Sequence, residues 1–221
     1  MSRFLVIMLF GLSCSCAAQT SKREFKSFDY QGKKISYAIQ LPENFNPKQT
    51  YPVAVGPSEA ASRDDQSYYW RDVKDTQGWI LLDFPIYTGN KAEVSAFLDH
   101  INSNYQVEGD KFHTICFSAN SSGIFSLVMS MSEYFHSITG MAGNPGSRNS
   151  DQLVKLKGVK VRFVVGDKDS YWMNAAKDRH AKLLEAGVES QIEIIKDGKH
   201  VLTDLIGTGV LTRMNKLRNT K

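Results

Sequence analysis

Residues 113–123 read His-Thr-Ile-Cys-Phe-Ser-Ala-Asn-Ser-Ser-Gly, and a mostly apolar helical pattern continues from there to Phe135. The pattern predicts a buried strand that turns directly into a helix. Such a turn can lift a serine hydroxyl clear of a sheet, provided that the side chains two residues before and after the serine are small. Cys116 and Asn120 hold these positions. Ser118 is therefore a candidate nucleophile, although an N-cap of the helix explains it about equally well.

The rest of the chain alternates strand and helix patterns, which implies an α/β fold with a mostly parallel sheet and helices on both faces. We expect strands at 33–41, 51–55, 79–84, 113–117, 137–142, 159–165 and 191–195, and helices at 64–76, 91–104, 123–135, 173–186 and 201–217. No repeat or linker interrupts this pattern, so we expect residues 19–221 to form one domain.

Two further predicted strands end in suggestive polar residues. One runs into Gly-Asp-Lys-Asp at 166–169, and the last runs into Asp-Gly-Lys-His at 197–200. Taken singly, an Asp in a loop is a common turn former, and a loop histidine is more often a bystander than a catalyst. Open parallel sheets, however, place their chemistry at the carboxyl ends of their strands. Ser118, Asp169 and His200 follow in the chain order nucleophile, acid, base, which is one of the known serine-triad orders.

At these residues the chain resembles the α/β-hydrolase superfamily, and most of all small esterases and carboxylesterases of the polyhydroxybutyrate-depolymerase and feruloyl-esterase type. The resemblance covers most of residues 30–205. It rests on the stretch 37–53, with its Leu-Pro and Tyr-Pro-Val, and on Cys-Phe-Ser-Ala-Asn at 116–120 in place of Gly-x-Ser-x-Gly. It also rests on the Gly-x-x-Asp at 166–169 and the histidine that ends 197–200.

The resemblance implies a catalytic triad and an acyl-enzyme. Ser118 would be the nucleophile, His200 the base that takes its proton, and Asp169 the acid that orients the imidazole. Asp167 is a second, weaker candidate for the acid. The expected fold is the α/β-hydrolase fold without a lid domain, and no cofactor or metal is implied.

The resemblance also implies an oxyanion hole built from backbone N–H groups. The N–H of Ala119, directly after the nucleophile, would be one donor. The other would come from the loop that follows the strand at 51–55, where the chain has Gly-Pro-Ser-Glu at 56–59 instead of a glycine-rich run. Pro57 has no N–H to donate, so Ser58 is the expected second donor.

Aromatic residues flank two of these loops, at 68–70 and at Tyr171 and Trp172. They could form a platform for an acyl, aryl or sugar group, but core packing is the more ordinary explanation. Only Trp172 is retained as a candidate substrate contact, because it lies close to the predicted acid. Residues 142–159 are too few for a lid domain, so we expect an open site that suits a bulky or polymer-attached ester.

The first 18 residues have the order of a secretory signal peptide: a positive charge, an apolar run at 4–12 and then small residues. The apolar run is far shorter than the about 20 residues needed to span a bilayer. We expect cleavage before Gln19 and a periplasmic or secreted protein. A lipid anchor at Cys14 or Cys16 is the alternative, although neither cysteine has Leu three positions earlier.

Composition excludes several classes of partner. Lys and Arg number 27 against 23 Asp and Glu, and the charges are interspersed, which argues against a nucleic-acid-binding surface. Cys116 would be the one cysteine that certainly remains after processing, so no internal disulfide is expected. The five histidines lack the spacing of a zinc site.

The sequence therefore predicts an exported serine hydrolase that cleaves carboxylic esters. Two alternatives stay open. One is an inactive hydrolase fold that serves as a surface binding protein, which the unusual Cys116, Asn120 and Pro57 keep in view. The other is a serine peptidase of the same fold. The acyl group, the alcohol and the oligomeric state are not indicated.

Overall fold

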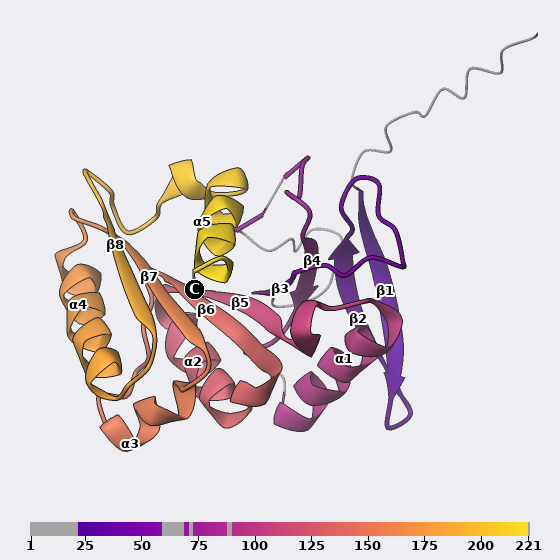
Figure 1. Ribbon diagram of the computed structural model, residues 1–221, viewed down its shortest axis with the longest axis horizontal. Coiled ribbons are helices and arrows are strands. Elements are labelled where there is room, and N and C mark those ends of the chain that lie inside the picture. Colours follow the sequence, from indigo (N-terminus) through magenta and orange to yellow (C-terminus); the bar gives the residue numbers. More distant parts are fainter. Residues whose placement is uncertain (1–21, 59–68, 71–72, 88–89, 221) are drawn as a thin grey trace, which may run out of the picture.

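An eight-stranded sheet runs through the molecule (Figure 1), and the computed structural model describes residues 22–58, 69–70, 73–87 and 90–220. The strand order is β1-β2-β4-β3-β5-β6-β7-β8; β2 is antiparallel to its neighbours β1 and β4, and the remaining strands are parallel. The strands are β1 Arg23–Tyr30, β2 Lys33–Gln40, β3 Val53–Pro57, β4 Ile80–Phe84, β5 Phe112–Phe117, β6 Phe135–Met141, β7 Lys160–Gly166 and β8 Ser190–Ile195.

Helices cover both faces of this sheet. In Figure 1, α5 lies above it, whereas α1, α2, α3 and α4 lie below. Their bounds are α1 Lys91–Asn104, α2 Ser121–Ser130, α3 Ser150–Leu153, α4 Ser170–Glu185 and α5 Thr208–Arg218. The mostly parallel, doubly covered sheet predicted from the alternating pattern is confirmed.

Alternation along the strands divides the core into two layers. On β3, Val53 and Val55 belong to the cluster between the sheet and helices α1, α2 and α4, whereas Ala54 belongs to the cluster between the sheet and α5. β4 alternates in the same way, with Leu82 in the first cluster and Leu81 in the second. A parallel strand with helices on both sides is apolar on both faces, which is why these short runs carry no polar face.

Four predicted helices differ from the observed ones. The helix expected at 123–135 is α2, which ends at Ser130, and Phe135 instead begins β6 with its side chain buried in the core. The helix expected at 201–217 is broken: a short 3₁₀ turn at Thr203–Leu205 precedes α5, and Gly207 between them has φ of 72°. α4 begins three residues earlier than expected, at Ser170. The described part of the helix expected at 64–76 is turn and irregular chain, because Trp70 and Val73 are held in the core by contacts with strand residues; the rest lies outside the described residues.

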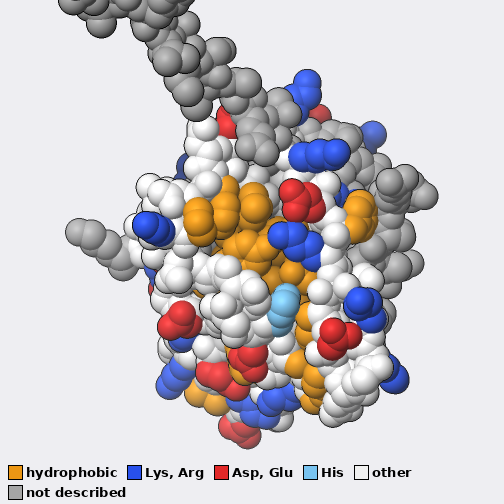
Figure 2. Space-filling model, turned by 90° about the vertical axis from the view of Figure 1, so that its right-hand side faces the viewer, with side chains coloured by type: hydrophobic (Ala, Val, Ile, Leu, Met, Phe, Trp, Pro, Cys, Tyr) orange, Lys and Arg blue, Asp and Glu red, His pale blue; other side chains and the backbone are white. Residues whose placement is uncertain are grey.

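β1 is a strand that the sequence pattern did not predict. It forms a hairpin with β2 through Gln31 and Gly32, whose φ values of 49° and 74° suit a type I′ turn. The hairpin is the outer edge of the sheet. Figure 2 looks onto this side of the molecule, where hydrophobic side chains form a patch with charged side chains around it.

The predicted signal peptide at 1–18, with Cys14 and Cys16, lies outside the described residues. In the part of the chain that is described, no helix is both long and apolar enough to cross a bilayer.

Candidate active site

The turn after β5 holds Ser118 in an unusual backbone conformation. Its φ is 47°, in the left-handed region that non-glycine residues seldom adopt. The Ser118 N–H donates to the carbonyl of Ala142 (3.1 Å), and the Ser118 carbonyl accepts from the Ser121 hydroxyl (2.6 Å). Asn120, and not Ser118, occupies the N-cap position of α2. A strained residue that its neighbours hold in place is typical of functional sites, and a serine N-cap does not account for it.

The two unusual residues of this turn fit for separate reasons. Cys116 is fully buried and small, and the loop after β6 passes close to it: a Cβ on Gly143 would lie 3.4 Å from its sulfur. Burial also raises the pKa of the Cys116 thiol, so this cysteine is an inert part of the core. Asn120 folds back over the turn, where its Oδ1 accepts the N–H of Phe117 at 2.8 Å. Asn120 thus stabilises the turn, a role that the sequence pattern did not indicate.

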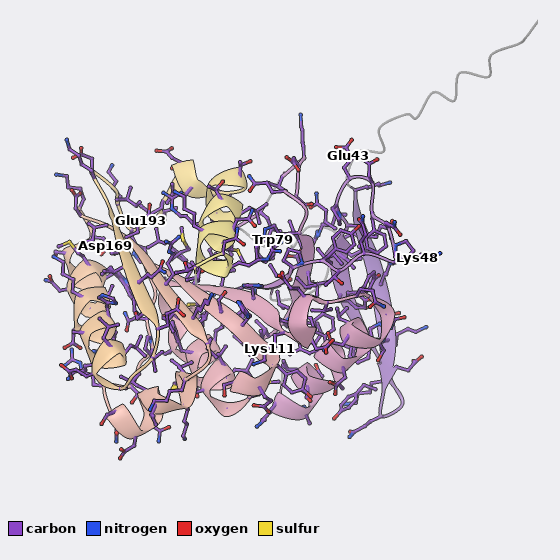
Figure 3. All side chains as sticks on the ribbon, viewed as in Figure 1. Glu43, Lys48, Trp79, Lys111, Asp169 and Glu193 are labelled. Carbon is purple, nitrogen blue, oxygen red and sulfur yellow. The ribbon has the colours of Figure 1, made fainter. Side chains whose placement is uncertain are left out.

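Three side chains meet at the carboxyl ends of β5, β7 and β8. Ser118 Oγ lies 2.9 Å from His200 Nε2, and His200 Nδ1 lies 2.6 Å from Asp169 Oδ2. In this arrangement the serine hydroxyl donates to Nε2, and the Nδ1–H donates to the carboxylate. Figure 3 labels Asp169 near the N-terminal end of α4. The structure therefore brings together the three residues that were proposed as nucleophile, base and acid.

In the part of the chain that the structure describes, the side chain of the alternative acid, Asp167, makes no hydrogen bond with His200. Its backbone N–H donates to the carbonyl of Ile195 at 3.0 Å, which ties the end of β7 to the end of β8. The side chain of Asp169, two residues later, reaches the imidazole instead. The geometry favours Asp169 over Asp167.

Two glycines allow the loops of Asp169 and His200 to touch. A Cβ on Gly166 would lie 2.1 Å from the carbonyl oxygen of Gly198, far inside any real contact. The N–H of Lys168 donates to that same carbonyl at 2.9 Å. Any side chain at position 166 would therefore push the two loops apart.

Two aromatic rings flank His200. The ring of Phe117 lies 4.9 Å from the imidazole centre, and that of Trp172 lies 5.9 Å away. The side chain of His200 is 38% exposed, whereas that of Asp169 is 12% exposed. The histidine is thus accessible to a substrate, while its carboxylate partner is largely sheltered from water.

Of the two predicted oxyanion donors, the structure places Ala119 beside the nucleophile but engages Ser58 elsewhere. Ala119 lines the cavity beside Ser118 and lies at the start of the helical turns that lead into α2, where N–H groups lack intrahelical partners. The expectation for Ser58 is wrong, because its N–H donates to the carbonyl of Phe84 at 3.1 Å. That bond extends the parallel pairing of β3 with β4, in which Pro57 lies opposite Phe84. Residues 59–68 lie outside the described residues.

A cavity of about 570 Å³ opens next to Ser118. Its walls come from the start of α2, the loop after β6 and the first half of α4; Trp172 is one of the lining residues. Its neighbour Tyr171 also lines the cavity and is 75% exposed. Of the aromatic residues at 68–70, Tyr69 and Trp70 are buried in the core as the ordinary explanation required, and Tyr68 lies outside the described residues.

Other polar residues of the cavity were not foreseen. They include Asn144, Arg148, Asp178 and Arg179. No sequence signal marks them, because they stand on the loop after β6 and on α4, away from the three recognisable strand ends. Among the described residues, no group of three or more His, Cys, Asp or Glu side chains could hold a metal ion.

No known family model matches this chain, and no curated protein is similar in sequence. Solved structures are similar in fold. A dienelactone hydrolase from Anabaena variabilis superposes with a TM-score of 0.66 at 13% identity, over 90% of this chain and 97% of that one. The feruloyl esterase module from Clostridium thermocellum, complexed with sinapinate, gives 0.64 at 10% identity over 90% and 87%.

An esterase from Rhizomucor miehei gives a TM-score of 0.63 at 9% identity, over 91% of this chain and 86% of that one. At such identities the similarity establishes architecture alone. The sheet order, the covering helices and these neighbours together show the α/β-hydrolase fold, as the resemblance implied.

Proposed function

We propose that this protein is a serine hydrolase that cleaves carboxylic esters through an acyl-enzyme on Ser118. The observation that carries the proposal is the continuous chain of hydrogen bonds from Ser118 through His200 to Asp169, with the serine on a left-handed turn beside an open cavity. The α/β-hydrolase fold supports it, since that fold places a nucleophilic serine at such a turn.

The reaction follows from the positions of the protons. As Ser118 Oγ bonds to the acyl carbon, its proton moves to His200 Nε2, and Asp169 stabilises the imidazolium that forms. The tetrahedral oxyanion receives a hydrogen bond from the N–H of Ala119. Its collapse expels the alcohol, which takes the proton from Nε2. Water then attacks the acyl-enzyme with His200 again as base, releasing the carboxylic acid and restoring the serine.

Labelling with a fluorophosphonate probe tests the nucleophile directly. The wild type should be labelled, and Ser118→Ala should not. Ser126→Ala is a matched control, because Ser126 is an exposed serine of α2 that does not line the cavity. The unlabelled wild type should release p-nitrophenol from p-nitrophenyl esters, and labelling should abolish this activity because the probe occupies the Ser118 hydroxyl.

A folded wild type that neither reacts with the probe nor cleaves esters would overturn the proposal. It would favour an inactive hydrolase fold that serves as a binding protein. Two residues after β3 are consistent with that alternative: the N–H of Ser58 already donates to Phe84, and Pro57 has no N–H, so neither supplies an oxyanion donor. Cleavage of peptide p-nitroanilides in preference to esters would instead indicate a peptidase.

We further propose that the chain is exported, on the evidence of the signal-like residues 1–18. The mature protein from a secreting host should begin at Gln19, as measured by N-terminal mass spectrometry. A lipid-modified N-terminus at Cys14 or Cys16 would instead indicate an anchored form, and an intact Met1 in the cytoplasm would refute export.

A further inference from the structure

The cavity beside Ser118 has a charged wall that the ester chemistry itself does not require. Its charged lining residues are Arg148 on the loop after β6, and Asp178 and Arg179 on α4. Ester cleavage through Ser118 needs a nucleophile, a base and oxyanion donors, and none of these roles requires an arginine in this place. The three residues therefore call for an explanation of their own.

Arg179 is held rigidly in this wall. Only 7% of its side chain is exposed. Its Nε donates to the carbonyl of Pro145 at 3.0 Å, and one terminal nitrogen pairs with Asp178. A guanidinium fixed in this way loses little conformational entropy when it binds a ligand. Arg179 is thus a preorganised positive charge, held in position by the loop after β6 and by α4.

The carboxylate of Asp178 is shared by a second cation. Arg148 Nε lies 3.4 Å from the same Oδ2 atom that pairs with Arg179, and the side chain of Arg148 is 69% exposed. Two guanidinium groups and one carboxylate leave one positive charge uncompensated in the cavity wall. Burial, and then the nearby charge of Arg148, lower the pKa of Arg179, but an arginine stays charged at neutral pH.

We infer that this wall binds an anionic group of the substrate, so that the preferred esters carry a carboxylate in addition to the bond that is cleaved. A carboxylate can receive paired hydrogen bonds from a guanidinium, and these charge-assisted bonds are about twice as strong as neutral ones. Arg148 supplies the exposed half of the site, and Arg179 supplies the buried half that its hydrogen bonds hold in place. The inference rests on the proposed function, because it names the substrate class of the same cavity.

The test compares two substrates of similar shape that differ in one terminal group, which is a carboxylate in one and a neutral carboxamide in the other. One is the p-nitrophenyl half-ester of glutaric acid, and the other is its neutral carboxamide analogue. We expect kcat/KM of the wild type to favour the acid by about tenfold at low ionic strength, which corresponds to about 1.4 kcal/mol. Salt should reduce this preference because it screens the exposed charge of Arg148.

Two variants and one control locate the effect. Arg148→Gln and Arg179→Gln should each bring the ratio of the two kcat/KM values towards one. Arg148→Gln is the safer variant, because its side chain is mostly exposed. Lys177→Gln removes the same charge from an exposed position on α4 that does not line the cavity, and it should leave the ratio unchanged.

Binding to Ser118→Ala separates this inference from the proposed function. Calorimetry with the two uncleaved esters should show tighter binding of the acid, and Arg148→Gln in that background should abolish the difference. If the wild type cleaves both esters equally, or if Lys177→Gln changes the ratio as much as Arg148→Gln, the anion site is refuted while the hydrolase stands. If neither ester is cleaved but the acid still binds more tightly, the anion site stands and the hydrolase falls. Equal binding, or no binding of either ester, refutes the site.

Discussion

Gly166→Ala should disable the site from a position outside it. The new Cβ would lie 2.1 Å from the carbonyl oxygen and 2.2 Å from the carbonyl carbon of Gly198. Ordinary contacts of this kind begin at about 3.4 Å, so the two loops must separate by more than 1 Å. These two glycines lie where the loop of Asp169 contacts the loop of His200. The same two loops carry the hydrogen bond between His200 Nδ1 and Asp169 Oδ2, which is 2.6 Å long.

A shift of this size breaks the bond between His200 and Asp169. Misplacement of catalytic groups by 1 Å can cost about 10²-fold in rate, so kcat/KM for a p-nitrophenyl ester should fall by about 10²-fold or more. The melting temperature should also fall, because the buried end of β7 is forced away from the loop that packs against it. The assay is steady-state ester hydrolysis, with circular dichroism to show that the variant is folded.

Gly123→Ala is the matched control. Gly123 lies in α2 without a positive φ, and a Cβ there meets no atom within 4 Å. Alanine should keep the activity and stabilise the helix by up to about 1 kcal/mol. A folded Gly166→Ala protein with the activity of Gly123→Ala would show that the contact between the two loops does not position the imidazole, and the reasoning would be wrong.

Three further predictions concern the same network and the core. Asp169→Asn should lower kcat by about 10³–10⁴-fold, since the amide favours the wrong tautomer of His200; a smaller loss than tenfold in stopped-flow hydrolysis would exclude Asp169 as the acid. Asn120→Ala should reduce the free energy of unfolding by about 1–2 kcal/mol, because the N–H of Phe117 loses its 2.8 Å acceptor; an unchanged urea midpoint would contradict this. His113 is buried, and burial followed by the charge of a neighbouring histidine lowers its pKa well below 6.5. Below about pH 6.5 the histidine is therefore protonated in the unfolded chain but not in the folded one. The free energy of unfolding should fall there by up to about 1.4 kcal/mol per pH unit for this residue, and it should be fully retained above that pH. Urea titrations at pH 5 and pH 7 should show a smaller change in the free energy of unfolding for His113→Asn than for the wild type.

The sequence was sufficient where local pattern determines structure. The helix at 91–104 was predicted with the bounds that α1 has, because its apolar stripe and its cap are both local. The buried strands were recognised for the same reason, since runs such as Val53–Val55 are apolar on both faces. β1 escaped because an edge strand needs no continuous apolar run, and only Gln31 and Gly32 signalled its turn.

The break at Gly207 and the irregular chain around Trp70 are decided by distant contacts. Gly207 adopts φ of 72°, and its N–H donates to the carbonyl of Tyr69, a bond between segments far apart in the chain. The expected donor Ser58 failed for a comparable reason. Its N–H is claimed by Phe84, and that pairing depends on the register of two strands that the local sequence does not specify.

By itself the sequence determined the strand ends and their order, and thereby the candidates Ser118, Asp169 and His200. Parallel strands have their carboxyl ends at one edge of the sheet, so chain order alone made a meeting of these side chains plausible. Only the tertiary structure decided that Asp169 and not Asp167 reaches the imidazole, and that Arg148 and Arg179 share one cavity wall with the serine. Such contacts arise from the packing of a loop against a helix, where no periodicity records the distance between side chains.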